Sequence, residues 1–217
     1  MSRALPGQPF LIDRVDFNRW SSFADDRADV SENIRRDYRK AAAVSAVVET
    51  RPGLAALGDV VRLVRLRSQV MRRNRQPFSF AMDVARHVLK ILSIGKGTFI
   101  ATVRADGRRP AAFFGVRFGD DVYYLAGGTE KTVNGYGSYL FLTLIEEWFR
   151  AHPLELYLGR QVACVAPATY KRGNHLYRRK LRATTGPGTA FQVRVAQPQP
   201  VSTASDPALA GVSGVRS

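Results

Sequence analysis

A glycine-rich segment, Asn134-Gly135-Tyr136-Gly137-Ser138, has the residue types best suited to hold a ligand. It precedes a stretch with helical periodicity, and the first N–H groups of a helix lack intrahelical partners and carry positive partial charge. Glycines also let the backbone approach an anion closely. The segment therefore predicts a cradle for a phosphate or pyrophosphate. A helix entered through a flexible loop produces the same local pattern.

The thiol and imidazole groups indicate no metal centre. The chain has one cysteine, Cys164, and three scattered histidines, so neither a disulfide nor a zinc site is predicted. Cys164 could act as a nucleophile. The alternative is a small buried apolar residue, because free cysteines are among the most buried residue types.

Three helices are predicted upstream of residue 97. Ser31 is a plausible N-cap of the first, which leads into a strand at 45–50, and an arginine-rich helix covers about 54–75. In the third helix apolar residues recur at three- and four-residue steps, the strongest amphipathic signal in the chain. That stripe consists of Ala81, Val84, Ala85, Val88, Leu89 and Leu92. His87 lies off the stripe and is expected to face solvent.

The period then changes to that of strands. A three-stranded antiparallel meander is predicted, with turns at Asp106-Gly107 and Gly119-Asp120. A helix, a strand, a basic segment and a last strand follow; we place them around 141–148, 154–158, 168–181 and 191–195. This order predicts an α+β fold whose mostly antiparallel sheet is flanked by helices. The predicted layout is a lead-in at 1–30, one domain at 31–196 and a disordered tail at 197–217.

The meander, glycine-rich loop, helix and strand resemble the centre of the GNAT acyltransferase fold. In that superfamily a loop of the form Gln/Arg-x-x-Gly-x-Gly/Ala holds the pyrophosphate of acyl-coenzyme A. Both glycines are matched here, while the leading basic or amide position is taken by Thr132, with Lys131 beside it. The resemblance implies acyl-coenzyme A as co-substrate, bound by Thr132, Val133, Asn134, Gly135, Gly137 and Ser138.

The chain is also similar to the FemAB-like branch, which includes peptidoglycan-bridge aminoacyltransferases and CelD-type acetyltransferase domains of polysaccharide synthesis. The similarity covers about residues 31–195. Its motifs are Arg35–Ala41, the meander and loop from Ala111 to Leu140, and Leu156–Arg160 followed by Tyr170-Lys171-Arg172-Gly173. It implies acetyl or aminoacyl transfer to an amine or hydroxyl of cell-envelope or polysaccharide synthesis, with aminoacyl-tRNA as a second possible donor.

Acyl transfer needs a group that takes the acceptor's proton and one that stabilises the oxyanion. By resemblance, Lys171 is expected at the reacting centre, with Arg172 as a lesser option. Tyr170 is a candidate general acid, and Glu130 and His175 are candidate bases, the latter because imidazole titrates near neutral pH. The alternatives are a solvated basic face, a core tyrosine and a simple loop charge.

The net charge of +15 comes mostly from arginine and attracts polyanions. The arginines at 62–75 and the basic segment at 171–182 could bind RNA together, aminoacyl-tRNA included. No window has the apolar length of a signal peptide or a membrane helix, so we expect a cytoplasmic location and no membrane span.

Two further function classes fit this sequence. One is a catalytically degenerate GNAT-fold protein that binds RNA or another polyanion, which the Thr132 position motivates. The other is a partner subunit, because FemAB-like proteins often pair two such domains and 217 residues suit one. The acceptor, the acyl group and the oligomeric state are left open.

Overall fold

The computed structural model describes residues 8–131, 135–151, 155–160 and 177–190. Pro9–Gly188 form one compact unit. A second unit comprises Met1–Gln8 and Thr189–Ser217, of which only Gln8, Thr189 and Ala190 are described.

Seven strands form one sheet in the order β2-β3-β4-β5-β6-β1-β7. The strands are β1 Gln8–Asp16, β2 Val47–Pro52, β3 Thr98–Ala105, β4 Arg108–Phe118, β5 Asp121–Thr129, β6 Glu155–Arg160 and β7 Thr184–Ala190. β5 and β6 run parallel, whereas β1–β6, β2–β3, β3–β4 and β4–β5 are antiparallel. The predicted meander is therefore present as β3, β4 and β5.

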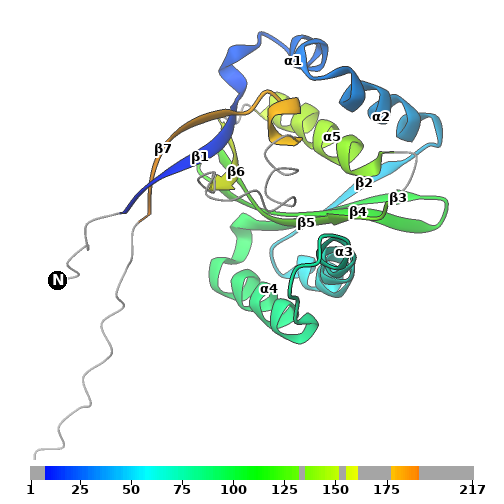
Figure 1. The fold of residues 1–217 in the computed structure, drawn as a ribbon, viewed down its shortest axis with the longest axis vertical. Coiled ribbons are helices and arrows are strands. Elements are labelled where there is room, and N and C mark those ends of the chain that lie inside the picture. The colour runs from blue at the N-terminus through cyan, green and yellow to red at the C-terminus, as the bar shows by residue number, and fades with distance from the viewer. Residues whose placement is uncertain (1–7, 132–134, 152–154, 161–176, 191–217) are drawn as a thin grey trace, which may run out of the picture. The chain divides into compact units, whose positions relative to one another are not determined.

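Helices cover both faces of the sheet (Figure 1). They are α1 Phe23–Asp29, α2 Glu32–Ala43, α3 Val60–Arg73, α4 Phe80–Ile94 and α5 Tyr136–Ala151, with shorter 3-10 segments η1 Phe17–Arg19, η2 Gly53–Asp59 and η3 Gly95–Gly97. α2 and α5 lie on one side of the sheet, and α3 and α4 lie on the other (Figure 1). The predicted α+β class is confirmed.

Consecutive residues of β4 supply the two hydrophobic cores. Side chains alternate between the faces of a strand, so Phe113 packs on the α5 side with Phe99 and Trp148. Phe114 packs on the α3–α4 side with Leu66 and the rest of the second core. Both phenylalanines are fully buried. The sheet is thereby fixed between two layers, and its strand ends can position a site.

The expected lead-in contributes a strand, β1, to the sheet. It pairs with β6 from Ile12↔Arg160 to Asp16↔Glu155. Its neighbour β7 begins at Thr184, just after the basic segment. The strand predicted at 191–195 lies outside the described residues.

α4 buries only part of its predicted apolar stripe: Val84 and Val88 pack against the second core, whereas Ala81, Ala85, Leu89 and Leu92 are exposed. Its inward face carries Asp83, His87 and Ile91, all buried. The expectation that His87 is solvent-exposed was wrong, since its side chain is 2% exposed and packs edge-on against Phe114. The physical reason is that Arg67 of α3 forms a 2.8 Å ion pair with Asp83, which brings this polar face of α4 against α3.

Asp26 of α1 is a fully buried carboxyl group, and both its oxygens lack a hydrogen-bond partner among the described residues. Burial, and then the charge of Asp29, raises the pKa of Asp26 to about 7. The folded state therefore binds a proton more tightly than the unfolded chain does, and stability falls as pH rises from about 4 to about 7.

Asp26→Asn removes this titration, so the variant should gain stability relative to wild type as pH rises. A shift in the pKa of Asp26 from 3.8 to about 7 corresponds to a stability difference of about 4 kcal/mol, which is fully developed above pH 7. Urea unfolding from pH 4 to pH 8 measures the difference, with the exposed Asp120→Asn as control. A difference that is the same at pH 4 and pH 8 would contradict the assignment.

Candidate functional site

A pocket of about 550 Å³ opens where β5 and β6 separate. The two parallel strands pair at only two positions, Val122↔Leu156 and Tyr123↔Tyr157. Beyond them, residues 124–129 of β5 and Leu158 and Gly159 of β6 line the pocket. This volume lies in the range of small-molecule sites, and both strands present backbone as well as side chains to it.

A β-bulge distorts β5 where it forms the pocket wall. The β4–β5 register steps from Phe114↔Ala126 to Gly115↔Tyr124, so Leu125 is an extra residue on β5. A bulge takes its extra residue out of the regular ladder and changes the direction of nearby backbone groups. Tyr124, Leu125 and Ala126 all line the pocket, so the irregular backbone lies at the site.

The start of α5 forms the adjoining wall. Gly135 has a φ of +61°, and Gly135, Gly137 and Ser138 all line the pocket. The first turn of α5 holds no acidic residue of its own, so the partial positive charge of the helix start is not offset from within the helix. The pocket thus brings together three of the predicted loop residues. Thr132, Val133 and Asn134 lie outside the described part of the chain.

Asp37 is a carboxylate on this wall that the sequence analysis missed as a site residue. It comes from α2, and its Oδ2 accepts a hydrogen bond of 3.2 Å from the Ser138 hydroxyl. No described cation forms an ion pair with it within 4.0 Å. In the sequence Asp37 stands in a run of basic residues and reads as surface charge; its position depends on the packing of α2 against α5.

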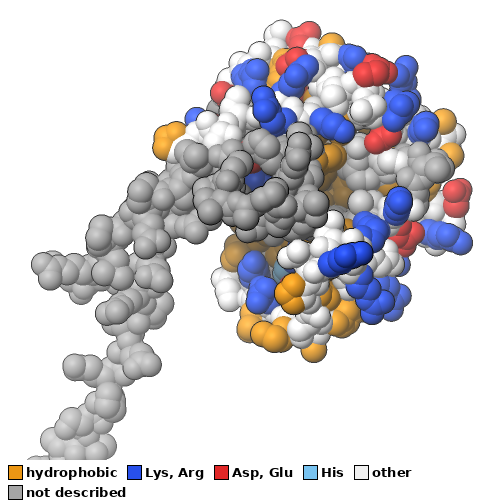
Figure 2. Space-filling model, viewed as in Figure 1, with side chains coloured by type: hydrophobic (Ala, Val, Ile, Leu, Met, Phe, Trp, Pro, Cys, Tyr) orange, Lys and Arg blue, Asp and Glu red, His pale blue; other side chains and the backbone are white. Residues whose placement is uncertain are grey.

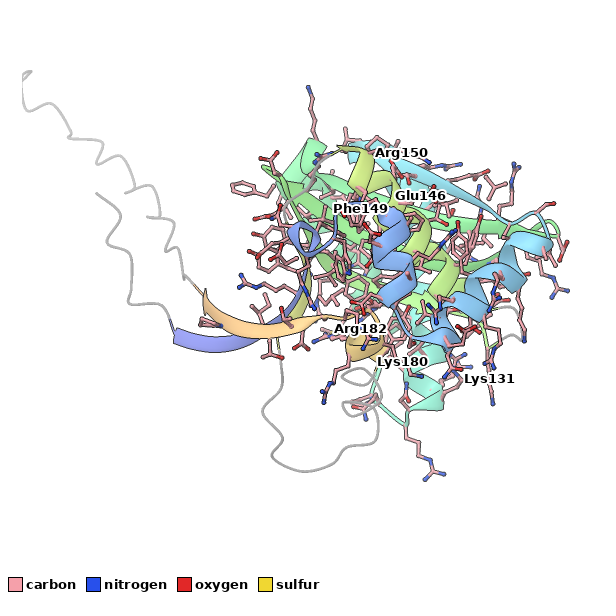
Figure 3. All side chains as sticks on the ribbon, turned by 90° about the horizontal axis from the view of Figure 1, so that it is seen from above. Lys131, Glu146, Phe149, Arg150, Lys180 and Arg182 are labelled. Atoms are coloured by element: carbon pink, nitrogen blue, oxygen red, sulfur yellow. The ribbon has the colours of Figure 1, made fainter. Side chains whose placement is uncertain are left out.

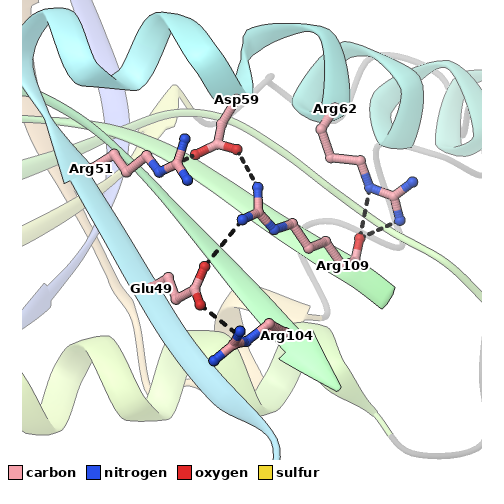
Figure 4. A network of polar contacts seen from close by, with 6 residues as sticks. All are labelled: Glu49, Arg51, Asp59, Arg62, Arg104 and Arg109. Atoms are coloured by element: carbon pink, nitrogen blue, oxygen red, sulfur yellow. Dashed lines mark hydrogen bonds and ion pairs between the residues drawn. The ribbon is translucent and has the colours of Figure 1, made fainter. Parts of the chain in front are cut away.

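Glu130 also lines the pocket, at the end of β5. Its N–H donates to the Pro110 carbonyl, and its Oε1 forms a 2.8 Å ion pair with Arg62 of α3. Arg62 donates further hydrogen bonds to the Arg109 carbonyl. The Arg109 side chain in turn pairs with Glu49 and Asp59 (Figure 4). Glu130 is therefore held at the rim by a network that spans β2, η2, α3 and β4.

The three cations that line the pocket differ in their partners. Arg67 is paired with Asp83, and Arg178 donates to Asp13 over 2.9 Å. Lys131, labelled in Figure 3, is exposed and has no ion pair with any acid in the described ranges. Asp37 and Lys131 are thus a carboxylate and an ammonium on the wall whose charges remain available to a ligand.

Tyr177 is a second wall residue that the sequence analysis missed. Its hydroxyl is fully buried near the Ser138 hydroxyl and has no hydrogen-bond partner among the described residues. Burial raises the pKa of Tyr177. Its helical turn, Tyr177–Lys180, is tied to α1 and α2, because the Ser31 N–H donates to the Lys180 carbonyl and Arg182 pairs with Asp29.

The sequence did carry a signal for this helical turn, because Tyr177 and Leu181 stand four residues apart, as on one face of a helix. Leu181 is buried in the structure.

The candidates Tyr170, Lys171 and His175, with Arg172, fall in 161–176 and lie outside the described residues. The described wall therefore combines a bulged strand, a glycine-hinged helix start, two carboxylates and a protonated phenol. That set suits transfer of an acyl group between a phosphate-bearing donor and a nucleophile.

The fold and the site define an acyltransferase-like α+β domain, and comparison with known families agrees. The family model of the GNAT acetyltransferase domain matches residues 28–172. The chain therefore belongs to the GNAT acetyltransferase domain family. No curated protein matches it.

Solved structures share the fold at low sequence identity. FemX superposes with a TM-score of 0.64 at 9% identity, over 83% of this chain and 60% of FemX. L-PGS from Bacillus licheniformis gives 0.54 at 12% identity, over 90% and 64% of the two chains. A tandem GNAT protein of the clavulanic acid pathway gives 0.50 at 13%, over 92% and 57%. The chain thus spans about 60% of the length of these structures.

No group of three His, Cys, Asp or Glu side chains within the described ranges is arranged to hold a metal ion. Among the helices that are described, none has both the length and the apolar character to cross a bilayer.

Proposed function

We propose that this chain transfers an acyl group from coenzyme A to an amine or hydroxyl acceptor in the pocket between β5 and β6. The observation that carries the proposal is the separation of these two strands beside the glycine-hinged start of α5. Family membership supports acyl-coenzyme A as the donor. The fold shared with FemX makes aminoacyl-tRNA the alternative donor.

The donor's phosphates are assigned to the start of α5. Backbone N–H groups in the first turn, at Gly137 and Ser138, attract negative charge, and Lys131 adds an exposed ammonium. Thr132, Val133 and Asn134 complete this phosphate site in the proposal. Asp37 lies beside the same turn, so the phosphates are expected on the Lys131 side of the glycines, away from that carboxylate.

The reacting carbonyl is assigned to the bulge on β5. A backbone N–H near Leu125 would donate to the carbonyl oxygen as it becomes an oxyanion, and such fixed donors lower the barrier of acyl transfer. The acceptor's nitrogen or oxygen forms a bond to the carbonyl carbon, and the bond from that carbon to the thiol sulfur breaks. Lys171 is proposed, by family resemblance, as a second stabiliser of the oxyanion.

Two protons must move in this reaction. Asp37 is proposed to take the acceptor's proton, since it lines the pocket and no described cation competes for it. Glu130 remains a candidate base, although its ion pair with Arg62 favours a positioning role. Tyr177 is proposed to protonate the leaving thiolate, because it lines the pocket and its buried hydroxyl, a phenol that is protonated at neutral pH, has no hydrogen-bond partner among the described residues. Tyr170 and His175 are proposed as auxiliary acid and base.

Tyr177→Phe tests this assignment. Loss of a general acid typically lowers turnover by about 100-fold or more, so kcat should fall by that factor while the Kd for acetyl-coenzyme A stays roughly the same. Release of the coenzyme A thiol in the presence of a panel of primary amines provides the assay. Tyr123→Phe is the matched control, because Tyr123 stacks on Tyr157 and does not line the pocket.

Calorimetry of the wild-type chain tests the donor itself. We expect a 1:1 complex with acetyl-coenzyme A; binding of aminoacyl-tRNA alone would select the alternative donor. If neither donor binds, the proposed function is wrong.

A further inference from the structure

The outward face of α4 is an apolar surface that no described element covers. Met82, Leu89 and Leu92 are 63%, 62% and 56% exposed. Together with Ala85 they recur at steps of three, four and three residues, which places them on one side of the helix. α4 already packs its opposite side, at Asp83, His87 and Ile91, against α3 and the sheet. The outward apolar face is therefore left uncovered by the described elements.

Further exposed apolar residues lie near the ends of α4. Phe80 and Ile94 are exposed at its two ends, on the side that carries Asp83, His87 and Ile91. η3, which follows α4, contacts both η2 and β4, and these carry the exposed Leu54 and Phe118. Figure 2 shows hydrophobic side chains gathered over α4, with basic side chains beside them. An apolar patch of this kind, rimmed by polar groups, marks an interaction site.

The charges around the patch have one sign. From Val60 to Gly97 the chain has nine Lys and Arg residues and one acid, Asp83, which is buried and paired with Arg67. The exposed members are Arg65, Arg72, Arg73, Arg75, Arg86 and Lys96. The α3–α4 layer, residues 60–97, thus presents apolar side chains and an exposed charge that is entirely positive.

Exposed apolar side chains together with positive charge favour one kind of binding partner over others. A second copy of the chain would bring two cationic layers together, which like-charge repulsion opposes. A nucleic acid would neutralise the arginines and leave the leucines uncovered. An anionic lipid surface satisfies both features, because an amphipathic helix can lie in its plane with the apolar side chains among the acyl chains and the basic ones at the headgroups.

We infer that the α3–α4 layer docks on an anionic lipid bilayer, with α4 lying in the interface. This inference goes beyond acyl transfer and does not depend on it. It has a bearing on the site, because α3 also lines the pocket through Arg67 and Val70. A docked layer would hold one wall of the pocket at the membrane surface, where an acceptor carried on a lipid is concentrated.

Vesicle co-sedimentation with the full chain tests the docking. Wild type should bind phosphatidylcholine vesicles that contain phosphatidylglycerol, bind pure phosphatidylcholine weakly, and lose binding as salt rises. Met82→Gln/Leu89→Gln/Leu92→Gln should lower the partition coefficient by about 10-fold or more, because much of the buried apolar area is lost. Arg65→Glu/Arg72→Glu should weaken binding to the anionic vesicles only.

Val47→Gln is the matched control, since Val47 is equally an exposed apolar residue but lies on β2, outside the layer. Circular dichroism checks that each variant is folded. Absence of wild-type binding to anionic vesicles would overturn the inference, as would undiminished binding of the triple variant. A wild-type dimer that the triple variant dissociates, without vesicle binding, would reassign the surface to a second copy. Donor calorimetry is independent of each of these outcomes.

Discussion

Gly135→Ala is expected to destabilise the fold by about 3 kcal/mol and to abolish donor binding. Gly135 has a φ of +61°, where a side chain costs about 1–2 kcal/mol. An added Cβ would also lie 2.3 Å from Asp37 Cβ and 2.4 Å from Asp37 Cγ. Because Asp37 Cβ is fixed to the backbone of α2, α2 and the start of α5 must move apart, and overpacking of this kind costs about 1–3 kcal/mol.

The control for Gly135→Ala is Gly119→Ala. Gly119 has a similar φ of +62°, but an added Cβ there has no atom within 4 Å. Urea unfolding measures both variants, and the difference between them isolates the contact with Asp37. Calorimetry with acetyl-coenzyme A then reports the effect on the site. Equal losses of stability in the two variants would show that α2 and α5 are not packed as closely as described.

Arg67→Met is expected to lower the free energy of unfolding by about 3–5 kcal/mol at pH 8. Arg67 and Asp83 form a largely buried ion pair, and loss of one partner leaves an uncompensated charge in the interior. His87 is close to the same carboxylate, because its Nε2 is 3.6 Å from Asp83 Oδ2. The cost should therefore depend on whether His87 can take over as the cation.

The pH dependence of this variant has a defined sign. Burial, helped by the charge of Arg67 and opposed by the attraction of Asp83, lowers the pKa of His87 to about 4. In wild type the unfolded chain binds this proton more tightly, so stability rises by about 3 kcal/mol between pH 4 and pH 6.5. Without Arg67 the pKa of His87 should rise, and the charged imidazole can pair with Asp83.

Arg67→Met should consequently be less harmful at pH 5 than at pH 8. The measurement is the difference in unfolding free energy between variant and wild type at each pH, which cancels the opposite slope contributed by Asp26. Arg65→Met, an exposed arginine on the same helix, is the control and should change stability little at either pH. A loss that is the same at pH 5 and pH 8 would show that His87 does not replace Arg67.

The sequence predicts the elements whose signals are local. The β3–β5 meander follows from two glycine turns, and the entry to α5 follows from Gly135 and Gly137. The order of these elements also carried the family resemblance, which the match over residues 28–172 confirms. Three residues of the pocket wall, Gly135, Gly137 and Ser138, could be named for the same reason.

The features that were missed depend on contacts between distant segments. β1 pairs with β6 about 140 residues away, and nothing local distinguishes it from a lead-in. Asp37 reaches the pocket only because α2 packs on α5. In α4, periodicity identified an apolar face but could not reveal that the ion pair with Arg67 turns a polar face inward.

The short pairing of β5 with β6 has a consequence for how a ligand would be held. β5 is an interior strand, yet after Tyr123 its edge toward β6 has no further ladder partner in the described register. Peptide groups there retain hydrogen-bonding capacity that an interior strand normally uses within the sheet. A thin, amide-bearing molecule inserted in that gap would act as a substitute strand, joining the two halves of the sheet across the open seam.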